Sequence, residues 1–580
     1  MPENNPNIEK LKAQFPQAIL ETSEFRGETS VKIRKEDLLA VCRFLRDEPD
    51  LRYDLLTYVT GIDYLKTGRV PRFEAVYGLY SLNHRRRLRL KVPLEGEPPT
   101  VPSVVSIWPG ANWHERETYD LMGIIFEGHP DLRRILLPDN WVGHPLRKDY
   151  PLGGEPVAFS TNQEDEVIRK HGQQIMDVPL PVSSIPPGVD MENHMVLNVG
   201  PQHPATHGVL RVVVELEGER VVSAHPDIGH LHSGIEKTAE YKTYQQVIPY
   251  TDRMDYVAAM TNNLGYILAV EKLLDIEVPP RAQALRVICC ELQRIAALTI
   301  AIGTNCLDLS GTIHALLLYT FREREEIMNL FEMISGSRLT PSYFCIGGVR
   351  WDAPPHFVEQ VRAFTSDFPR RLAEYETMLM KNPIWLSRTK GIGVITAEQA
   401  VALGMTGPCL RATGIPYDLR KYEPYCGYDQ YDFETPTATG GDCYDRFGVR
   451  LEDMKQSIRI INQALDNLPE GPIKCDDYKI VFPPREELDY SMEALIHHFK
   501  LVTEGFSPPP GEVYAAVESP KGEIGYYLVS DGTPKPYRLK IRGPAFSNLQ
   551  ALNTMAQGGM FSDMVAIIGA IDITLGEVDR

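Results

Sequence analysis

One stretch decides the fold of the longer part of the chain: residues 279–296, which read PPRAQALRVICCELQRIA. Its two prolines suit the first turn of a helix, where the backbone amides have no partner within the helix. The pattern predicts a buried helix in a mainly helical region, and it makes Cys289 and Cys290 small core residues rather than metal ligands. The apolar side chains of this stretch recur at helical spacing and share one face: Leu285, Ile288, Cys289, Leu292, Ile295 and Ala296.

Strand-like segments mark both ends of the chain. Residues 73–82 and 88–92 predict neighbouring strands of a small α+β domain. Residues 525–529 and 537–541 lie on either side of an Asp-Gly pair and predict a hairpin near the C-terminus.

Basic and apolar side chains alternate in residues 84–92, which read HRRRLRLKV. Leu88 and Leu90 fall on one face of such a strand, and Arg87, Arg89 and Lys91 fall on the other. The alternation predicts a half-buried strand whose basic face is solvated. The alternative is that the basic face docks on an acidic partner.

The domain boundary is expected between Tyr150 and about Met191, where proline, glycine and polar residues indicate a linker. A chain of 580 residues is too long for one hydrophobic core. We therefore expect a multidomain α+β protein. It has a small α+β domain over residues 1–150, a linker over 151–191, and a mainly helical domain with flanking β segments over 192–580.

Composition excludes several classes of protein. The net charge of -18 argues against a general nucleic-acid binder, which needs a basic surface. No stretch approaches the roughly 18 apolar residues of a membrane span, and the N-terminus lacks a targeting pattern, so we expect a soluble, cytoplasmic chain. The nine cysteines form no CxxC pair, which predicts reduced thiols and offers no ligand set for an iron–sulfur cluster or a structural zinc.

Two loops carry the candidate functional residues: residues 200–208, GPQHPATHG, and residues 250–256, YTDRMDY. His203 and His207 have the spacing of a helical metal site, but Pro204 breaks the helix that such a site requires. From the residues alone, the histidines are structural loop residues and Tyr256 is a core tyrosine. By the same reasoning, Asp308 is a helix cap.

Longer motifs change that interpretation. Residues 115–124, ERETYDLMGI, with residues 144–151, HPLRKDYP, closely resemble the C subunit of bacterial respiratory complex I, the proton-pumping NADH:quinone oxidoreductase. Residues 197–580 resemble its D subunit through GIEK at 234–237, LRATG at 410–414 and VSDG at 529–532. Nearly the whole chain is covered. The resemblance implies a fused C/D subunit, active only within the enzyme complex, whose D part is related to the large subunit of nickel–iron hydrogenases.

This resemblance implies a quinone site. The family holds the quinone headgroup between residues matching His207 and Tyr256, with a carboxylate matching Asp308 paired to the histidine. Quinone reduction takes two electrons and two protons, and imidazole and phenol groups can donate those protons. A carboxylate would orient the imidazole ring and raise its proton affinity.

Arg253 matches an arginine beside the terminal 4Fe-4S cluster, which a partner subunit holds. A fixed cation there would raise the cluster potential. The alternative is a surface ion pair of Arg253 with Asp252 or Asp255.

The resemblance also implies partners and a location. The expected partners are the B subunit with the terminal cluster, the I and G subunits, and the membrane-arm H subunit. Ubiquinone or menaquinone would be the substrate, no metal or cofactor would be held by this chain alone, and the chain would lie peripherally at the cytoplasmic face of the bacterial membrane. NADH would bind elsewhere, because Gly391 and Gly393 lack the third glycine of a dinucleotide loop, where Thr396 stands.

Two rival functions fit parts of the pattern. A membrane-bound energy-converting hydrogenase would hold nickel through two CxxC pairs. The places of those cysteines are taken here by Asp255, Ala258, Thr574 and Glu577, and a soft nickel–iron centre has no ligands without thiolates. The other alternative, a role in assembly only, fits residues 1–150, where no catalytic group of residues is evident.

The chain departs from the family pattern near the expected cluster. Thr340 stands where many relatives have a histidine, and Cys345 stands where they have an arginine. Losing two potentially cationic groups predicts a lower-potential cluster suited to menaquinone, which a redox titration would test. A slightly longer segment at residues 309–314 also blurs the placement of Asp308.

Overall fold

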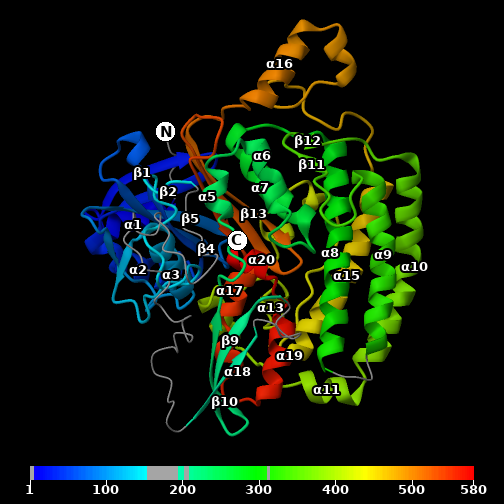
Figure 1. Cartoon of the computed structure of the whole chain (residues 1–580), viewed down its shortest axis with the longest axis horizontal. Coiled ribbons are helices and arrows are strands. Elements are labelled where there is room, and N and C mark those ends of the chain that lie inside the picture. The colour runs from blue at the N-terminus through cyan, green and yellow to red at the C-terminus, as the bar shows by residue number, and fades with distance from the viewer. Residues whose placement is uncertain (1–5, 153–193, 201–207, 310–313) are drawn as a thin grey trace, which may run out of the picture.

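The computed structural model describes residues 6–152, 194–200, 208–309 and 314–580. Figure 1 shows a sheet-containing N-terminal part on one side and a bundle of long helices on the other. The C-terminus lies between them, near the centre of the view. The prediction of a multidomain α+β protein is confirmed.

The N-terminal part is built on a five-stranded sheet with the order β1-β2-β5-β4-β3. The predicted pair of strands is present as β4 and β5, which are antiparallel and place Leu79 opposite Leu88. The elements of this part are α1 (Pro6–Gln14), β1 (Ile19–Phe25), β2 (Glu28–Ile33), α2 (Leu38–Asp47), β3 (Leu55–Asp63), β4 (Phe73–Ser81), β5 (Arg86–Leu94), β6 (Thr100–Pro102), α3 (Ala111–Met122) and β7 (Ile125–Glu127).

The basic face of β5 is not solvated, so that prediction was wrong. Arg87 donates to Glu423 at 2.8 Å and to Glu523 at 3.1 Å, and Lys91 donates to Glu512. These carboxylates belong to the C-terminal part, more than 300 residues away in sequence. The acidic surface that covers the basic face of this strand therefore belongs to the C-terminal part of the same chain.

The C-terminal part contains the predicted helix as α8 (Pro280–Leu309), which begins at the second proline. Cys289 and Cys290 are buried, which confirms their predicted place in the core. The long helices around α8 are α7 (Ala259–Leu274), α9 (His314–Ser335), α10 (Pro355–Leu379) and α15 (Cys443–Asp466). Shorter helices are α5 (Ile235–Ala239), α6 (Tyr244–Thr251), α11 (Pro383–Thr389), α12 (Ala397–Ala402), α13 (Pro408–Arg411) and α14 (Leu419–Tyr422).

Two three-stranded sheets flank the helices. The predicted C-terminal hairpin is present, with Val529 of β14 opposite Arg538 of β15. The strands are β8 (Met195–Val199), β9 (Arg211–Glu217) and β10 (Arg220–Asp227) in one sheet, β13 (Gly511–Ser519), β14 (Gly522–Ser530) and β15 (Arg538–Arg542) in the other, and the short pair β11 (Phe344–Cys345) and β12 (Gly348–Val349). The chain ends in α17 (Pro544–Gln550), α18 (Leu552–Ala556), α19 (Phe561–Ile571) and α20 (Leu575–Asp579).

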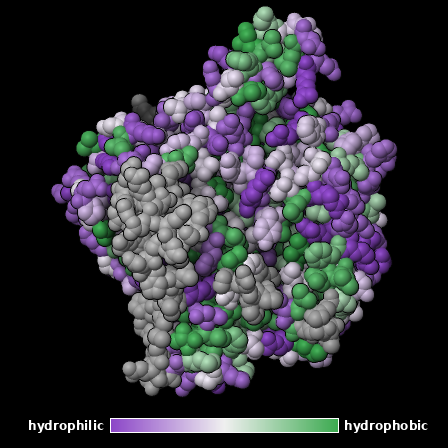
Figure 2. All heavy atoms as spheres, in the orientation of Figure 1, coloured by the Kyte–Doolittle hydropathy of each residue, from purple (hydrophilic) through white to green (hydrophobic). Residues whose placement is uncertain are grey.

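Helix α16 (Met492–Thr503) projects from the body at the top of Figure 1. Figure 2 shows hydrophobic side chains gathered on this projection. Met492 and Phe499 are 71% and 66% exposed, and Ile496 and Val502 are also exposed. Across the described residues, no helix combines the length and the hydropathy needed to cross a membrane.

Candidate functional site

The loop before α7 is held by buried asparagine side chains. The Nδ2 atom of Asn262 donates to the carbonyl oxygens of Thr251 at 3.3 Å and Asp255 at 3.2 Å. Asn263 donates to the Thr251 hydroxyl at 2.8 Å. Because buried amide groups must be hydrogen-bonded, these contacts fix the backbone that carries the predicted residues.

Side chains of this loop divide between the interior and the surface. Asp252 and Asp255 are fully buried, whereas Tyr256 is 44% exposed and the Arg253 side chain is 62% exposed. Partial burial raises the pKa of Tyr256, and the ammonium of Lys521 opposes that shift. The phenol of Tyr256 therefore stays protonated at neutral pH, and its side chain is partly open to solvent.

Arg253 is only loosely tied to the protein. Its Nη1 atom donates to the carbonyl oxygen of Pro249 at 2.7 Å and lies 3.6 Å from the Asp252 carboxylate. The alternative stated from the sequence was an ion pair of Arg253 with Asp252 or Asp255, and the structure places Asp252 within ion-pair distance. Other N–H groups of the exposed guanidinium make no hydrogen bond with the described residues. This geometry fits both alternatives, a surface ion pair and a contact with a partner subunit.

His203 and His207 lie in residues 201–207, outside the described residues. The described end of their loop, Gly208, packs on α20, because a Cβ added there would lie 3.1 Å from Leu575. The next residue of α20, Gly576, packs on the other loop, where a Cβ would lie 2.6 Å from the carbonyl oxygen of Met254. Helix α20 therefore contacts both loops that the sequence singled out.

Asp308 lies in the last turn of α8 and is partly buried. A side chain caps the N-terminus of a helix from the residue just before it, so the prediction of a helix cap was wrong for Asp308. The residues that follow α8, 310–313, lie outside the described part of the chain.

Behind Tyr256 lies a buried charged cluster, Asp255, Lys521, Thr574 and Glu577. The Oδ1 atom of Asp255 accepts hydrogen bonds from the Lys521 ammonium at 3.0 Å and from the Thr574 hydroxyl at 3.1 Å. Lys521 also donates to Thr574. Asp255 stands at a position of the first nickel-binding cysteine pair, and Thr574 stands at a position of the second. The two residues are therefore in contact, and the Lys521 ammonium donates a hydrogen bond to each of them.

Sequence reasoning missed Lys521. It stands in the turn between β13 and β14, and no local pattern marks it. Only the fold brings it to Asp255, which is 266 residues away in sequence.

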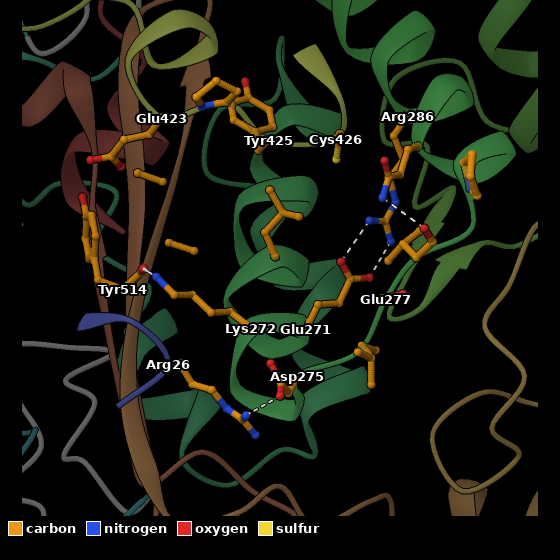
Figure 3. Close-up of a pocket in the computed structure, with 18 of the residues that line it drawn as sticks. Arg26, Glu271, Lys272, Asp275, Glu277, Arg286, Glu423, Tyr425, Cys426 and Tyr514 are labelled. Carbon is orange, nitrogen blue, oxygen red and sulfur yellow. Dashed lines mark hydrogen bonds and ion pairs between the residues drawn. The ribbon is translucent and has the colours of Figure 1, made fainter. Parts of the chain in front are cut away.

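A cleft of about 790 Å³ opens in another region, beside α7 and the start of α8 (Figure 3). Two pairs of its charged side chains form ion pairs: Arg286 with Glu271 at 2.6 Å, and Arg26 with Asp275 at 2.6 Å. Tyr256 does not line this cleft.

The described parts of the chain bring together no group of three or more His, Cys, Asp or Glu side chains that could hold a metal ion. Their cysteines are free thiols, and most of them are buried.

Family models match both parts of the chain. Residues 31–156 match the model described as "Respiratory-chain NADH dehydrogenase, 30 Kd subunit", and residues 311–580 match "Respiratory-chain NADH dehydrogenase, 49 Kd subunit".

Whole-chain relatives agree with these matches. The fused C/D subunit of NADH-quinone oxidoreductase from Bdellovibrio bacteriovorus is 43% identical, covering 96% of this chain and 95% of the relative. Its counterpart from Gluconacetobacter diazotrophicus is 47% identical, covering 85% and 81%. A separate D subunit of the same enzyme from Chloroflexus aurantiacus is 53% identical, covering 70% of this chain and 98% of the relative. The chain therefore belongs to the fused C/D subunits of NADH-quinone oxidoreductase, and it is a subunit of that respiratory complex.

Proposed function

We propose that this chain forms the quinone headgroup site of complex I and supplies protons for quinone reduction. The observation that carries the proposal is the loop before α7, which turns Tyr256 and Arg253 outward while it buries Asp252 and Asp255. A rigid loop that presents a protonated phenol beside an exposed guanidinium suits a substrate that takes up electrons and protons together.

In the proposed reaction, two electrons reach the quinone from the terminal 4Fe-4S cluster of the B subunit. One carbonyl oxygen takes a proton from the Tyr256 phenol, and the other takes a proton from the imidazolium of His207. Asp308 orients the His207 ring. Both donors are then reprotonated from water, and the product is the quinol.

Arg253 is proposed to lie beside that cluster, where its positive charge favours the reduced state. Thr340 and Cys345 supply no such charge, because a threonine is neutral and burial raises the pKa of the Cys345 thiol. This supports the expectation of a low-potential cluster suited to menaquinone.

The remaining proposals concern assembly. Residues 1–150 act as a C-subunit unit and residues 192–580 as a D-subunit unit, joined by a linker over 151–191. The chain lies peripherally at the cytoplasmic face of the membrane, in contact with the B, I, G and H subunits. The exposed apolar side chains of α16 support burial of that helix against one of these subunits, because monomeric proteins rarely expose such a patch.

A hydrogenase function is disfavoured by the buried cluster. A nickel–iron centre needs soft thiolate ligands. Asp255 and Thr574 instead share the ammonium of Lys521.

The test is Tyr256→Phe in membranes that contain the whole complex. We expect quinone reduction by NADH to fall on the order of 100-fold, the usual contribution of a general acid. NADH oxidation by an artificial acceptor should be unchanged, since that reaction does not use the quinone site. Tyr250→Phe is the matched control and should retain both activities. If Tyr256→Phe also retains both, Tyr256 is a packing residue and the assignment of the site is wrong.

A further inference from the structure

Helix α16 is apolar on two sides. Ala494 and Leu501 are buried, and they pack the helix onto the rest of the projection, residues 476–506. The residues of the other side recur at spacings of three and four, which places them on one face of the helix. This face is the α16 stripe, and its members are exposed: Met492, Leu495, Ile496, Phe499 and Val502.

The α16 stripe is open along its whole length. Phe499 stands at its centre, and Figure 2 shows hydrophobic side chains on the projection with hydrophilic ones beside them. Single exposed apolar residues are common, but a contiguous row of five is not. Such a row marks a surface that contacts a protein or a membrane.

Local contacts fix the helix that carries the stripe. The Ser491 hydroxyl accepts a hydrogen bond from the Ala494 amide at 3.3 Å and so caps the first turn. The ring of His498 packs on the ring of Phe482, with centroids 5.5 Å apart. A helix of this length is marginal in water on its own, so these contacts present a preformed surface and lower the entropic cost of binding.

The charge around the stripe is acidic. Residues 476–506 contain seven Asp and Glu residues against three Lys and Arg residues, a net charge of -4. Across the described residues, no lysine or arginine lies within ion-pair distance of these seven carboxylates, and Glu493 has only its neighbour His497 at 3.6 Å. The seven are Asp476, Asp477, Glu486, Glu487, Asp489, Glu493 and Glu504.

Three kinds of surface can cover an apolar stripe, and charge separates them. The anionic face of a membrane attracts lysine and arginine and repels carboxylates. A second copy of this chain would bring together two projections of -4 and two chains of -18. A different protein with a basic rim around an apolar groove matches both the stripe and the acidic residues beside it.

We propose that the α16 stripe binds in an apolar groove, edged by lysine and arginine residues, on another subunit of the respiratory complex. This inference rests on the proposed assembly of the chain with partner subunits and names the chemistry of the partner surface. Phe499 is the anchor, because aromatic side chains at the centre of an interface carry most of its binding energy. Glu493 and Glu504, on the same edge of the stripe as Lys500, meet the basic rim.

The first test is Phe499→p-benzoylphenylalanine, a photo-crosslinking residue, in the assembled complex. Mass spectrometry then identifies the peptide bound to position 499. We expect a peptide from another subunit that is apolar and in which lysine and arginine outnumber aspartate and glutamate. A crosslink to lipid, to a second copy of this chain or to an acidic peptide would overturn the inference, as would the absence of a crosslink.

The second test measures the anchor. Phe499→Asp should lower the amount of chain retained in the detergent-extracted complex by about tenfold or more. Phe499→Leu keeps an apolar anchor and should stay within about threefold of the wild type. Val70→Asp is the matched control, because Val70 is 90% exposed and lies outside the projection. Thermal denaturation of the full chain should be the same for Phe499→Asp and the wild type, since the side chain is exposed before assembly.

The third test reverses the charge beside the stripe and also decides the matter if Phe499→Asp unfolds the chain. Glu493→Lys with Glu504→Lys should lower retention about fivefold at low salt, and the difference should shrink at high salt as the charges are screened. Glu398→Lys, an exposed glutamate of α12, is the control and should retain the wild-type amount. Equal retention of the double variant and the control at both salt concentrations would overturn the basic rim.

The outcomes separate this inference from the proposed quinone site. If Phe499→Asp is retained in full while Tyr256→Phe still loses quinone reduction, the docking surface fails and the quinone site stands. If Tyr256→Phe has no effect while Phe499→Asp is lost from the complex, the quinone site fails and the docking surface stands.

Discussion

Two groups of buried charged residues contain the same residue types, but they differ in how their carboxylates are paired. On the basic face of β5, Arg87 and Lys91 meet Glu523 and Glu512 across the interface between the two parts of the chain. Behind Tyr256, the Glu577 carboxyl oxygens have no hydrogen-bond partner among the described residues. The first group is balanced and joins two surfaces, whereas the second has unused acceptors and can hold a proton.

The pKa shifts of the two groups follow this difference. Burial opposes the charge of Glu523, but Arg87, Arg542 and the hydrogen bonds from Tyr417 and Tyr514 together hold its pKa below the usual value. Burial likewise opposes the charge of Glu577, and there the cations do not offset it, so the pKa rises to about 8. At neutral pH one carboxyl is a fixed anion and the other is an acid.

The largest expected effect comes from removing Lys521, the cation of the buried cluster that contains Asp255, Thr574 and Glu577. Lys521→Met would leave Asp255 buried without its ammonium partner, and the loss of one member of a buried pair costs about 3 to 5 kcal/mol. Thermal denaturation of the purified complex would measure that loss. Lys521→Met combined with Asp255→Asn should recover part of it, because both charges are then gone. A single variant as stable as the wild type would show that the cluster needs no cation.

A smaller effect is expected at the balanced interface. Arg87→Gln removes the charged donor shared by Glu423 and Glu523, but Glu523 keeps hydrogen bonds from Tyr417 and Tyr514 at 2.8 Å. We expect a loss of about 2 kcal/mol in stability. The rate of quinone reduction in the assembled complex should not change, and a lower rate would mean that this interface also affects the proposed quinone site.

The sequence predicted what local periodicity controls. Proline and apolar spacing were enough for α8 and for the burial of Cys289, and an Asp-Gly turn with flanking apolar runs was enough for the β14–β15 hairpin. The environment of β5 could not be predicted, because its acidic partner comes from the distant C-terminal part. The alternation of residues shows which face of the strand is basic, but it does not show which part of the chain covers that face.

The candidate site divides in the same way. Tyr256 and Arg253 were singled out through the family resemblance, and the structure adds that both side chains are exposed on a loop held by buried asparagines. Lys521 was missed, because it enters the site only through the packing of the β13–β14 turn. The roles of His207, Tyr256, Arg253 and Asp308 remain proposals that rest on family resemblance.

The most direct test of the proposed quinone site compares Tyr256→Phe with Tyr250→Phe in membranes that contain the whole complex. We predict that only Tyr256→Phe slows quinone reduction by NADH, on the order of 100-fold, and that NADH oxidation by an artificial acceptor is unchanged in both variants. Equal rates of quinone reduction in the two variants would contradict the account.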